Sequence, residues 1–205
     1  MNDFATALLT HLEMSFLGVL MGCVVGVFLA TLLKNRASAA KAVFAFIDII
    51  QTVPTLAMLI FLMLIFGLNN TTVILAIFLY SLFPITRNTY VGLANVPGGV
   101  LRAGQGLGMT NLQLYLMVEL PIALPVIFSG LRLAIIAALG IATTGVFIGA
   151  GGLGMLIWRG IQTRNTMMLL SGAIPVSAMA ILFEFLFTYM EKRLTNRTKE
   201  RRSVK

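Results

Sequence analysis

Long apolar stretches separated by short polar segments are the main pattern of this chain. About five of them are long enough, as helices rising about 1.5 Å per residue, to cross about 30 Å of hydrocarbon. They do not alternate apolar and polar side chains as membrane-spanning β-strands do. The pattern therefore predicts an all-α, polytopic membrane protein. The expected transmembrane helices cover about residues 16–33, 43–66, 72–93, 124–148 and 167–190.

Composition supports a membrane location. The chain is 59% hydrophobic and only 11% charged, whereas a soluble domain carries about 25% charged residues. A net charge of +8 suggests nucleic-acid binding, but seven of the fifteen Lys and Arg lie in residues 192–205, after the last apolar stretch. Such clusters are typical of topology determinants. We therefore expect membrane lipid as a partner and no nucleic acid, with a transmembrane domain at 1–191 and a basic cytoplasmic tail at 192–205.

The distribution of charge predicts an orientation. The first residues contain Asp3 and Glu13 but no Lys or Arg, and the 67–70 loop is uncharged. Because Lys and Arg are enriched on the cytoplasmic side, the N-terminus is expected outside and the C-terminus in the cytoplasm. Arg159 and Arg164 are exceptions, since they fall outside. The basic residues assigned to cytoplasmic loops are Lys34, Arg36, Lys41, Arg87 and Arg102.

Two predicted spans carry local patterns of their own. Gly18, Gly22 and Gly26 recur every fourth residue, which predicts a face that another helix approaches closely. The second span is interrupted by Gln51-Thr52-Val53-Pro54-Thr55. Pro54 lacks an N–H and is expected to kink the helix. Polar groups at membrane depth are costly unless they face a cavity or a partner, so this segment is predicted to kink the span, to line a pathway, or both.

The loop at about 95–121 is too long for a simple turn between spans. Apolar residues alternate irregularly with polar ones along it, which predicts short amphipathic helices broken near Gly106 and Gly108. Such helices fit the groove of a partner protein, or lie flat on the membrane surface.

The same loop resembles the EAA motif of permeases in binding-protein-dependent ABC importers. That motif is Glu-Ala-Ala, three residues, Gly, nine residues, an aliphatic residue, one residue and Leu-Pro. Here Arg102-Ala103-Gly104, Gly108, Val118 and Leu120-Pro121 match its spacing. Arg102 replaces the acidic residue and Gly104 replaces the second alanine. The resemblance implies that the coupling loop (95–121) docks on an ATPase through Arg102, Ala103, Gly104, Gly108, Leu120 and Pro121.

Three further segments extend the resemblance over nearly the whole chain, towards the osmoprotectant branch that imports glycine betaine, carnitine or choline. They are Gln51 to Ala57, Pro84 to Tyr90 and Gly149 to Gly154. The resemblance implies the type I importer permease fold, a second permease copy or paralogue, an extracytoplasmic solute-binding protein and cytoplasmic ATPase subunits. The residues expected at the translocation pathway or gate are Gln51, Thr52, Pro54, Thr55, Asn88, Gly149, Gly151, Gly152 and Gly154.

The chain lacks the motifs of an enzyme. It has no G-x-x-x-x-G-K-[ST] sequence, so it cannot hydrolyse ATP by a P-loop. ATP and Mg are therefore expected on the separate ATPase, with no cofactor on this chain. Residues 149–154 match G-x-G-x-x-G but follow a membrane span instead of a strand, which favours an outer loop or gate.

The lone His11 and Cys23 offer no metal site, and His11 is expected at the surface or membrane interface. A methionine-type ABC permease, an ion-driven carrier and a membrane enzyme are the alternatives.

Overall fold

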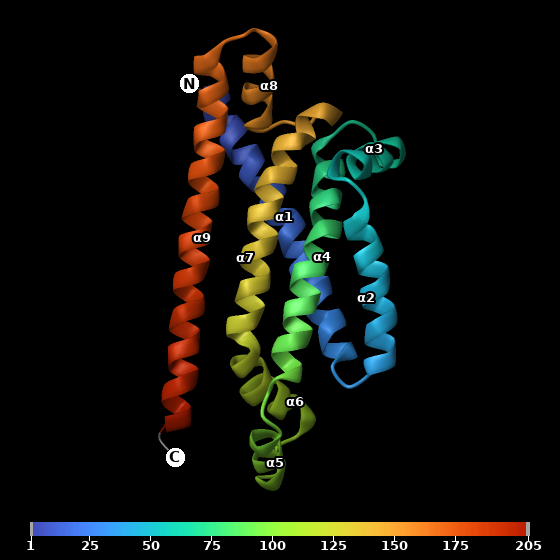
Figure 1. Cartoon of the computed structure of the whole chain (residues 1–205), viewed down its shortest axis with the longest axis vertical. Helices are drawn as coiled ribbons and strands as arrows, with labels where there is room; N and C mark the ends of the chain where they lie inside the picture. The colour runs from blue at the N-terminus through green and yellow to red at the C-terminus, as the bar shows by residue number, and fades with distance from the viewer. Residues whose placement is uncertain (1, 204–205) are drawn as a thin grey trace.

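The computed structural model describes the backbone of residues 2–203 and the side chains of residues 4–195. Every regular element in this part of the chain is helical, as the apolar pattern predicts. Figure 1 shows the helices running mostly along one long axis. The elements are α1 (Asn2–Leu33), α2 (Ala37–Thr52), α3 (Thr55–Phe66), α4 (Asn70–Ala94), α5 (Gly98–Gly106), α6 (Asn111–Leu114), a π-helix η1 (Tyr115–Glu119), α7 (Leu120–Thr144), a 3-10 helix η2 (Gly145–Ile148), α8 (Gly154–Gln162) and α9 (Thr166–Ser203).

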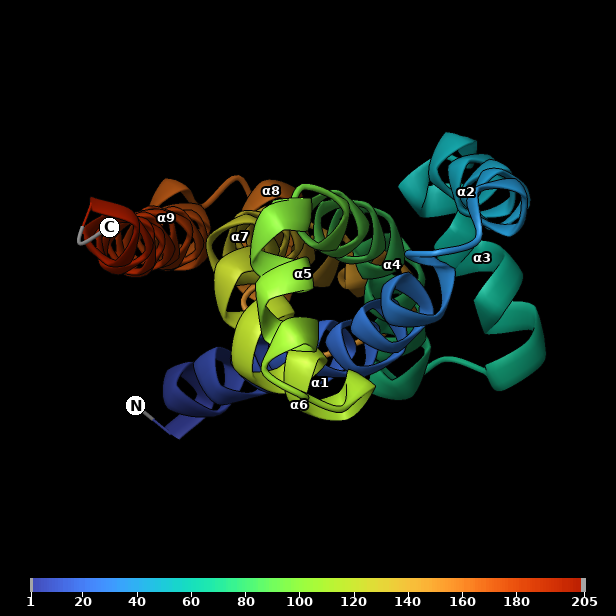
Figure 2. The same ribbon diagram turned by 90° about the horizontal axis from the view of Figure 1, so that it is seen from below.

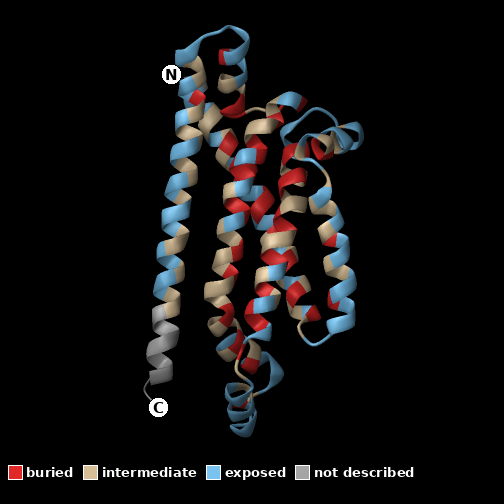
Figure 3. Cartoon of the chain, viewed as in Figure 1, coloured by how far each residue is buried: buried red, intermediate tan, exposed pale blue. Residues whose placement is uncertain are grey.

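Helices α1, α4 and α7 form the core of the bundle (Figures 2 and 3). The predicted glycine face of α1 is where α4 approaches. A Cβ added at Gly18 would lie 2.5 Å from Ile77, and one added at Gly22 would lie 2.6 Å from Ser81. Both distances are too short for any real side chain, so the absence of Cβ atoms sets the spacing of α1 and α4. The prediction of close helix packing on this face is confirmed.

Four helical segments are long and apolar enough to span a membrane, and the bent pair of α2 and α3 makes a possible fifth. The four are α1, α4, α9 and the continuous run from Asn111 to Ile148. The predicted second span exists, but it is not one kinked helix. Its two halves meet at an angle of 97°, because Val53 and Pro54 adopt extended backbone conformations between them. Figure 1 shows α3 lying across the end of the bundle.

Helix α9 lies at the edge of the bundle and keeps most of its surface exposed (Figure 3). Polar bonds attach it to α7, since Arg132 Nη1 donates to Thr188 Oγ1 at 2.8 Å and to Glu184 Oε1 at 3.2 Å. Residues 192–203, predicted as a separate tail, continue α9 without a break. The side chains of residues 196–205 lie outside the described residues.

The ends of the bundle carry different elements (Figure 1). One end holds α5, α6 and the turn between α1 and α2, and is called the coupling end below. The other end holds α8, α3 and the 149–154 loop. The expectation that Arg87 lies in a cytoplasmic loop is wrong, because Arg87 lies inside α4. Its guanidinium is 3.9 Å from Asp48 Oδ1 on α2, so a helix-to-helix ion pair replaces the expected loop position.

Candidate translocation pathway and coupling loop

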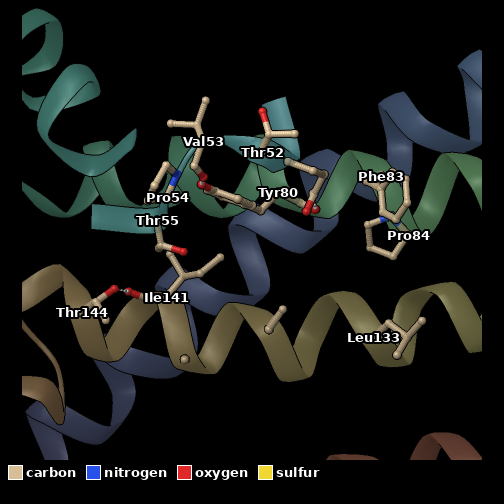
Figure 4. Close-up of a pocket in the computed structure, with 13 residues that line it drawn as sticks. Thr52, Val53, Pro54, Thr55, Tyr80, Phe83, Pro84, Leu133, Ile141 and Thr144 are labelled. Atoms are coloured by element: carbon tan, nitrogen blue, oxygen red, sulfur yellow. Dashed lines mark hydrogen bonds between the residues drawn. The ribbon is translucent and has the colours of Figure 1, made fainter. Parts of the chain in front are cut away.

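A cavity of about 700 Å³ lies where the α2–α3 break faces α4 and α7 (Figure 4). The polar interruption of the second span forms one wall, and a stripe of small and apolar residues on α7 forms the opposite wall. The lining consists of Gln51, Thr52, Val53, Pro54, Thr55, Tyr80, Phe83, Pro84, Leu133, Ala137, Gly140, Ile141 and Thr144.

Two hydrogen bonds join the broken span to α4. Gln51 Nε2 donates to the backbone oxygen of Tyr80 at 2.7 Å. In an unbroken helix that oxygen would accept from residue 84, but Pro84 has no N–H. The Tyr80 hydroxyl in turn donates to the backbone oxygen of Val53, which the helix break has left without a helical partner. Pro84 in α4 and the break between α2 and α3 thus each free a carbonyl, which a side chain from the other element satisfies.

The chemistry of the cavity suits a small solute with a cationic group whose charge is surrounded by alkyl groups. Tyr80 and Phe83 contribute aromatic rings, and Thr52, Thr55 and Thr144 contribute hydroxyl-bearing side chains. None of the residues that line it in the described part of the chain is charged. Aromatic faces attract cations that are weakly hydrated, such as quaternary ammonium groups.

The structure brings only some of the predicted pathway residues together. Gln51, Thr52, Pro54 and Thr55 line the cavity. Asn88 does not, because its Nδ2 donates to the backbone oxygen of Pro84 at 2.7 Å in its own helix. It packs instead at the close approach of α4 and α7, where a Cβ added at Gly130 would lie 2.9 Å from the Asn88 Cβ.

The sequence analysis missed Tyr80, Phe83 and Thr144 as lining residues. A signal was available for one of them. Tyr80 lies four residues before Pro84, the position whose carbonyl a helical proline always leaves free. Phe83 and Thr144 carry no comparable signal, because their place depends on how α4 and α7 pack.

The glycines of the 149–154 loop lie away from the cavity, at the end of the bundle opposite the coupling loop. Gly149 and Gly152 have φ of 71° and 95°, a region that favours glycine. The Gly151 N–H donates to Asn70 Oδ1 at 2.9 Å. A Cβ added at Gly154 would lie 2.2 Å from the Thr143 oxygen. The loop is therefore held closely against α4 and α7.

The same loop covers His11. The expectation of a surface or interfacial histidine is wrong, because the His11 side chain is fully buried. A Cβ added at Gly152 would lie 3.2 Å from His11 Nδ1, so only a glycine lets the loop close over the ring. His11 thus helps to hold the loop against α1.

In the coupling loop, a helix stop and a helix start follow each other within three residues. Gly108, at φ 76°, ends α5. Its N–H donates to Gln105 O at 2.9 Å and the N–H of Met109 donates to Gly104 O at 3.1 Å, the two bonds of a Schellman cap. Thr110 and Gln113 then form a capping box that starts α6. The predicted break at Gly108 is confirmed.

Gly104 lies at the contact between α5 and α6. A Cβ there would lie 2.7 Å from Leu114 Cδ1, so an alanine at this position would require the Leu114 side chain to shift. Arg102 and Ala103 are exposed on α5. Leu120 and Pro121 open α7, directly after the π-helix.

The outer surface of the coupling loop is apolar. Leu107 is 84% exposed and Leu112 is 67% exposed, and both belong to the part that extends beyond the bundle in Figure 1. Leu112 lies at the start of the apolar run Asn111–Ile148, whereas Leu107 lies outside the candidate membrane spans of the described residues, so lipid contact does not account for its exposure. The exposed Leu107 side chain indicates a surface for a protein partner. Val100, Leu116 and Met117 are exposed on the same loop.

Comparison with known proteins gives consistent results. Residues 18–196 match the family described as binding-protein-dependent transport system inner membrane component. The chain is 46% identical over 196 residues to the choline transport system permease protein OpuBD of Bacillus subtilis, covering 95% of this chain and 87% of that one. It is 46% identical over 186 residues to the glycine betaine/carnitine/choline transport system permease protein OpuCD of the same organism, covering 90% and 81%.

More distant similarity is also informative. The osmoprotectant import permease protein OsmW of Salmonella typhimurium is 36% identical over 190 residues, covering 90% of this chain and 88% of that one. Among solved structures, a chain of the MetNI methionine ABC transporter in an inward-facing conformation superposes with a TM-score of 0.82 at 22% identity, over 95% of this chain and 97% of that one. That likeness shows the type I importer permease fold.

Family membership sets aside the ion-driven carrier and the membrane enzyme as functions. The protein is a multi-pass inner membrane protein without a catalytic role, and ATP hydrolysis belongs to a separate subunit. The extent of the match, together with the spacing of the coupling loop, shows that this chain belongs to the binding-protein-dependent transport system inner membrane components, the permease subunits of ABC importers.

Proposed function

We propose that this permease imports a quaternary ammonium osmoprotectant such as glycine betaine, carnitine or choline. The functions of its relatives support this substrate class, since those at 36–46% identity are permeases for choline, for glycine betaine, carnitine and choline together, or for osmoprotectants. The methionine transporter is similar at only 22% identity, which concerns the fold and gives no reason to prefer an amino acid.

The solute is proposed to pass through the cavity between the α2–α3 break and α7. Its uncharged, partly aromatic lining supports this route. The aromatic residues Tyr80 and Phe83 are proposed to contact the trimethylammonium group, while Gln51, Thr52 and Thr55 are polar neighbours. We assign selective capture of the solute to a separate extracytoplasmic binding protein, and passage to this cavity. The 149–154 loop, at the far end from the coupling loop, is the proposed gate element.

The coupling loop is proposed to dock on the ATPase. The observation that carries this proposal is the exposed apolar surface around Leu107 and Leu112, on a loop extending beyond the bundle. Burying a leucine side chain contributes about 1.5–3 kcal/mol, so this surface supports a stable contact. Arg102 adds a charge at its edge. In this arrangement the coupling end is cytoplasmic and the N-terminal end of α1 is outside, with a second permease copy or paralogue completing the pathway.

The substrate class is tested by uptake in cells that lack their own osmoprotectant importers and express this permease with its ATPase and binding protein. We expect labelled choline, carnitine or glycine betaine to be taken up, with an unlabelled member of the group competing. A substitution of Tyr80 by Leu is expected to reduce uptake. Uptake of labelled methionine, uncompeted by glycine betaine, carnitine or choline, would overturn the assignment in favour of a methionine-type permease.

A further inference from the structure

At the coupling end, the C-terminal turn of α1 touches the π-helix that joins the coupling loop to α7. Lys34 Nζ makes an ion pair with Glu119 Oε2. The same ammonium lies 5.1 Å from the centroid of the Tyr115 ring. The Tyr115 hydroxyl is 2.9 Å from Thr31 Oγ1. These four residues, Thr31, Lys34, Tyr115 and Glu119, are called the α1 joint below.

The direction of the hydroxyl bond follows from the partners of Thr31. Thr31 Oγ1 donates its proton to the backbone oxygen of Val27 at 2.8 Å. Its lone pairs remain free to accept, so Tyr115 is the donor to Thr31. Tyr115 is therefore held at its hydroxyl by Thr31 in the last turn of α1 and at its ring face by Lys34, the residue directly after the helix.

The ion pair of the α1 joint is largely shielded from water. The side chains of Lys34 and Glu119 are 19% and 10% exposed. In such surroundings a charge pair is strongly orienting, and removal of one partner leaves the other charge buried and unpaired. A basic residue that only sets the orientation of a membrane protein needs no buried partner. Lys41 on α2 is exposed, whereas Lys34 is shielded and paired, so orientation alone does not explain Lys34.

The place of the joint in the chain gives it a mechanical role. The π-helix η1 begins at Tyr115 and ends at Glu119. The backbone N–H of Leu120 donates a hydrogen bond to the backbone oxygen of Tyr115. The coupling loop begins at the end of α4 and continues through η1 directly into α7, so both α4 and α7 follow any movement of the loop. Helix α1 has no such covalent connection to the loop. It is linked through the α1 joint, and it is packed closely on α4 through Gly18 and Gly22.

We propose that the α1 joint transmits movement of the coupling loop to the adjoining end of α1, so that α1 moves together with α4 and α7 when the ATPase closes. Its four members are positioning residues of the transport cycle. The proposal rests on the docking of the coupling loop on the ATPase proposed above. Without the joint, the loop would still dock and ATP would still be hydrolysed, but the end of α1 beside the loop would no longer follow α4 and α7.

The test uses the full complex of permease, ATPase and binding protein in proteoliposomes. Three quantities are measured: ATPase retained on the purified permease, ATP hydrolysis, and labelled glycine betaine taken up per ATP hydrolysed. Glu119→Gln and Lys34→Met are expected to keep ATPase retention and hydrolysis while uptake per ATP falls by about fivefold or more. Lys41→Met is the matched control, expected to keep all three wild-type values.

Milder variants keep the proposal falsifiable if the charge variants fail to assemble. Tyr115→Phe and Thr31→Val remove only the hydroxyl bond. Each is expected to lower uptake per ATP, and the double variant is expected to lower it no further than the larger single effect. Wild-type uptake per ATP in both single variants would overturn the joint while leaving docking intact. A wild-type complex that retains no ATPase would instead contradict the docking proposal itself.

Discussion

Gln51 Nε2 donates a hydrogen bond to the backbone oxygen of Tyr80 at 2.7 Å, and this oxygen is the one that Pro84 leaves without a helical partner. The bond ties the broken second span to the centre of α4. It also explains a polar side chain at membrane depth, because the glutamine satisfies a carbonyl that would otherwise face the cavity unpaired. The cavity wall therefore depends on a proline in one helix and a glutamine in another.

This relationship predicts a rescue. Gln51→Leu leaves the Tyr80 oxygen unsatisfied and is expected to destabilise the permease by about 1–3 kcal/mol. Adding Pro84→Ala supplies an N–H at position 84, so the double variant is expected to regain part of the lost stability. Thermal unfolding of the detergent-solubilised permease checks both changes. A double variant less stable than Gln51→Leu alone would show that the Tyr80 carbonyl is not the reason for the glutamine.

A second prediction concerns Gly108. Its φ of 76° is unfavourable for other residues, but a Cβ there would meet nothing within 4 Å. Gly108→Ala is therefore expected to cost about 1–2 kcal/mol through conformation alone, Gly108→Asn less, and Gly108→Leu at least as much as alanine. ATP-driven uptake is expected to fall in the same order. Gly99→Ala is the control, since its Cβ would also meet open space and its φ is not in the left-handed region. Normal uptake by Gly108→Leu would contradict coupling through this loop.

Gly104 is limited by space. Alanine at this position would place its Cβ 2.7 Å from Leu114 Cδ1, and overpacking typically costs about 1–3 kcal/mol. Gly104→Ala is expected to displace α5 from α6 and to weaken retention of the ATPase. Leu114→Ala in the same chain makes room, so the double variant is expected to retain more ATPase than Gly104→Ala. If trimming Leu114 gives no improvement, the contact does not set the spacing of α5 and α6.

The nature of the docking surface can be tested by comparing a charge with an apolar residue. Exposed ion pairs contribute about 0–1 kcal/mol, so Arg102→Glu is expected to reduce ATPase binding by less than about tenfold. Leu107 is 84% exposed. Leu107→Asp introduces a charge into this apolar surface and is expected to abolish retention of the ATPase. Affinity measured with the purified ATPase separates the two variants. A larger effect from Arg102→Glu than from Leu107→Asp would indicate electrostatic docking.

Orientation gives an independent prediction. Reporter domains inserted in the loop at Asn69 and fused after Lys205 are expected on opposite faces of the membrane, with the latter in the cytoplasm. The measurement is protease or enzymatic accessibility in intact cells. Both reporters on one face would contradict the proposed topology, in which the α2–α3 pair crosses the membrane as one broken span.

The sequence predicted the features that depend on local properties. Span positions follow from apolar length, the break at Gly108 from backbone preference, and the close α1–α4 packing from the spacing of Gly18 and Gly22. The size of the α2–α3 bend could not be predicted, because Pro54 removes one hydrogen bond but the direction of α3 depends on the Tyr80 contact with Val53. Sequence alone gave a kink where the structure has a 97° break.

Residues whose positions depend on distant contacts were harder to place from the sequence. Asn88 was expected at the pathway from the resemblance of the segment Pro84 to Tyr90, yet it lies outside the cavity lining and donates to the Pro84 oxygen in its own helix. His11 looked like an interfacial residue because no partner lies near it in sequence. It is buried because the distant Gly152 lets a loop close over it. Glu119 gave no sign of pairing with Lys34, since only the fold brings α1 and η1 together.

The most direct test of the account is ATP-dependent import by the reconstituted complex. Proteoliposomes containing the permease and its ATPase receive labelled glycine betaine and binding protein on one side, with ATP and Mg on the side of the coupling loop. The account predicts accumulation of solute that requires ATP, binding protein and an intact apolar coupling surface, and that is lost in Leu107→Asp. Equal accumulation without the ATPase, or in Leu107→Asp, would contradict it.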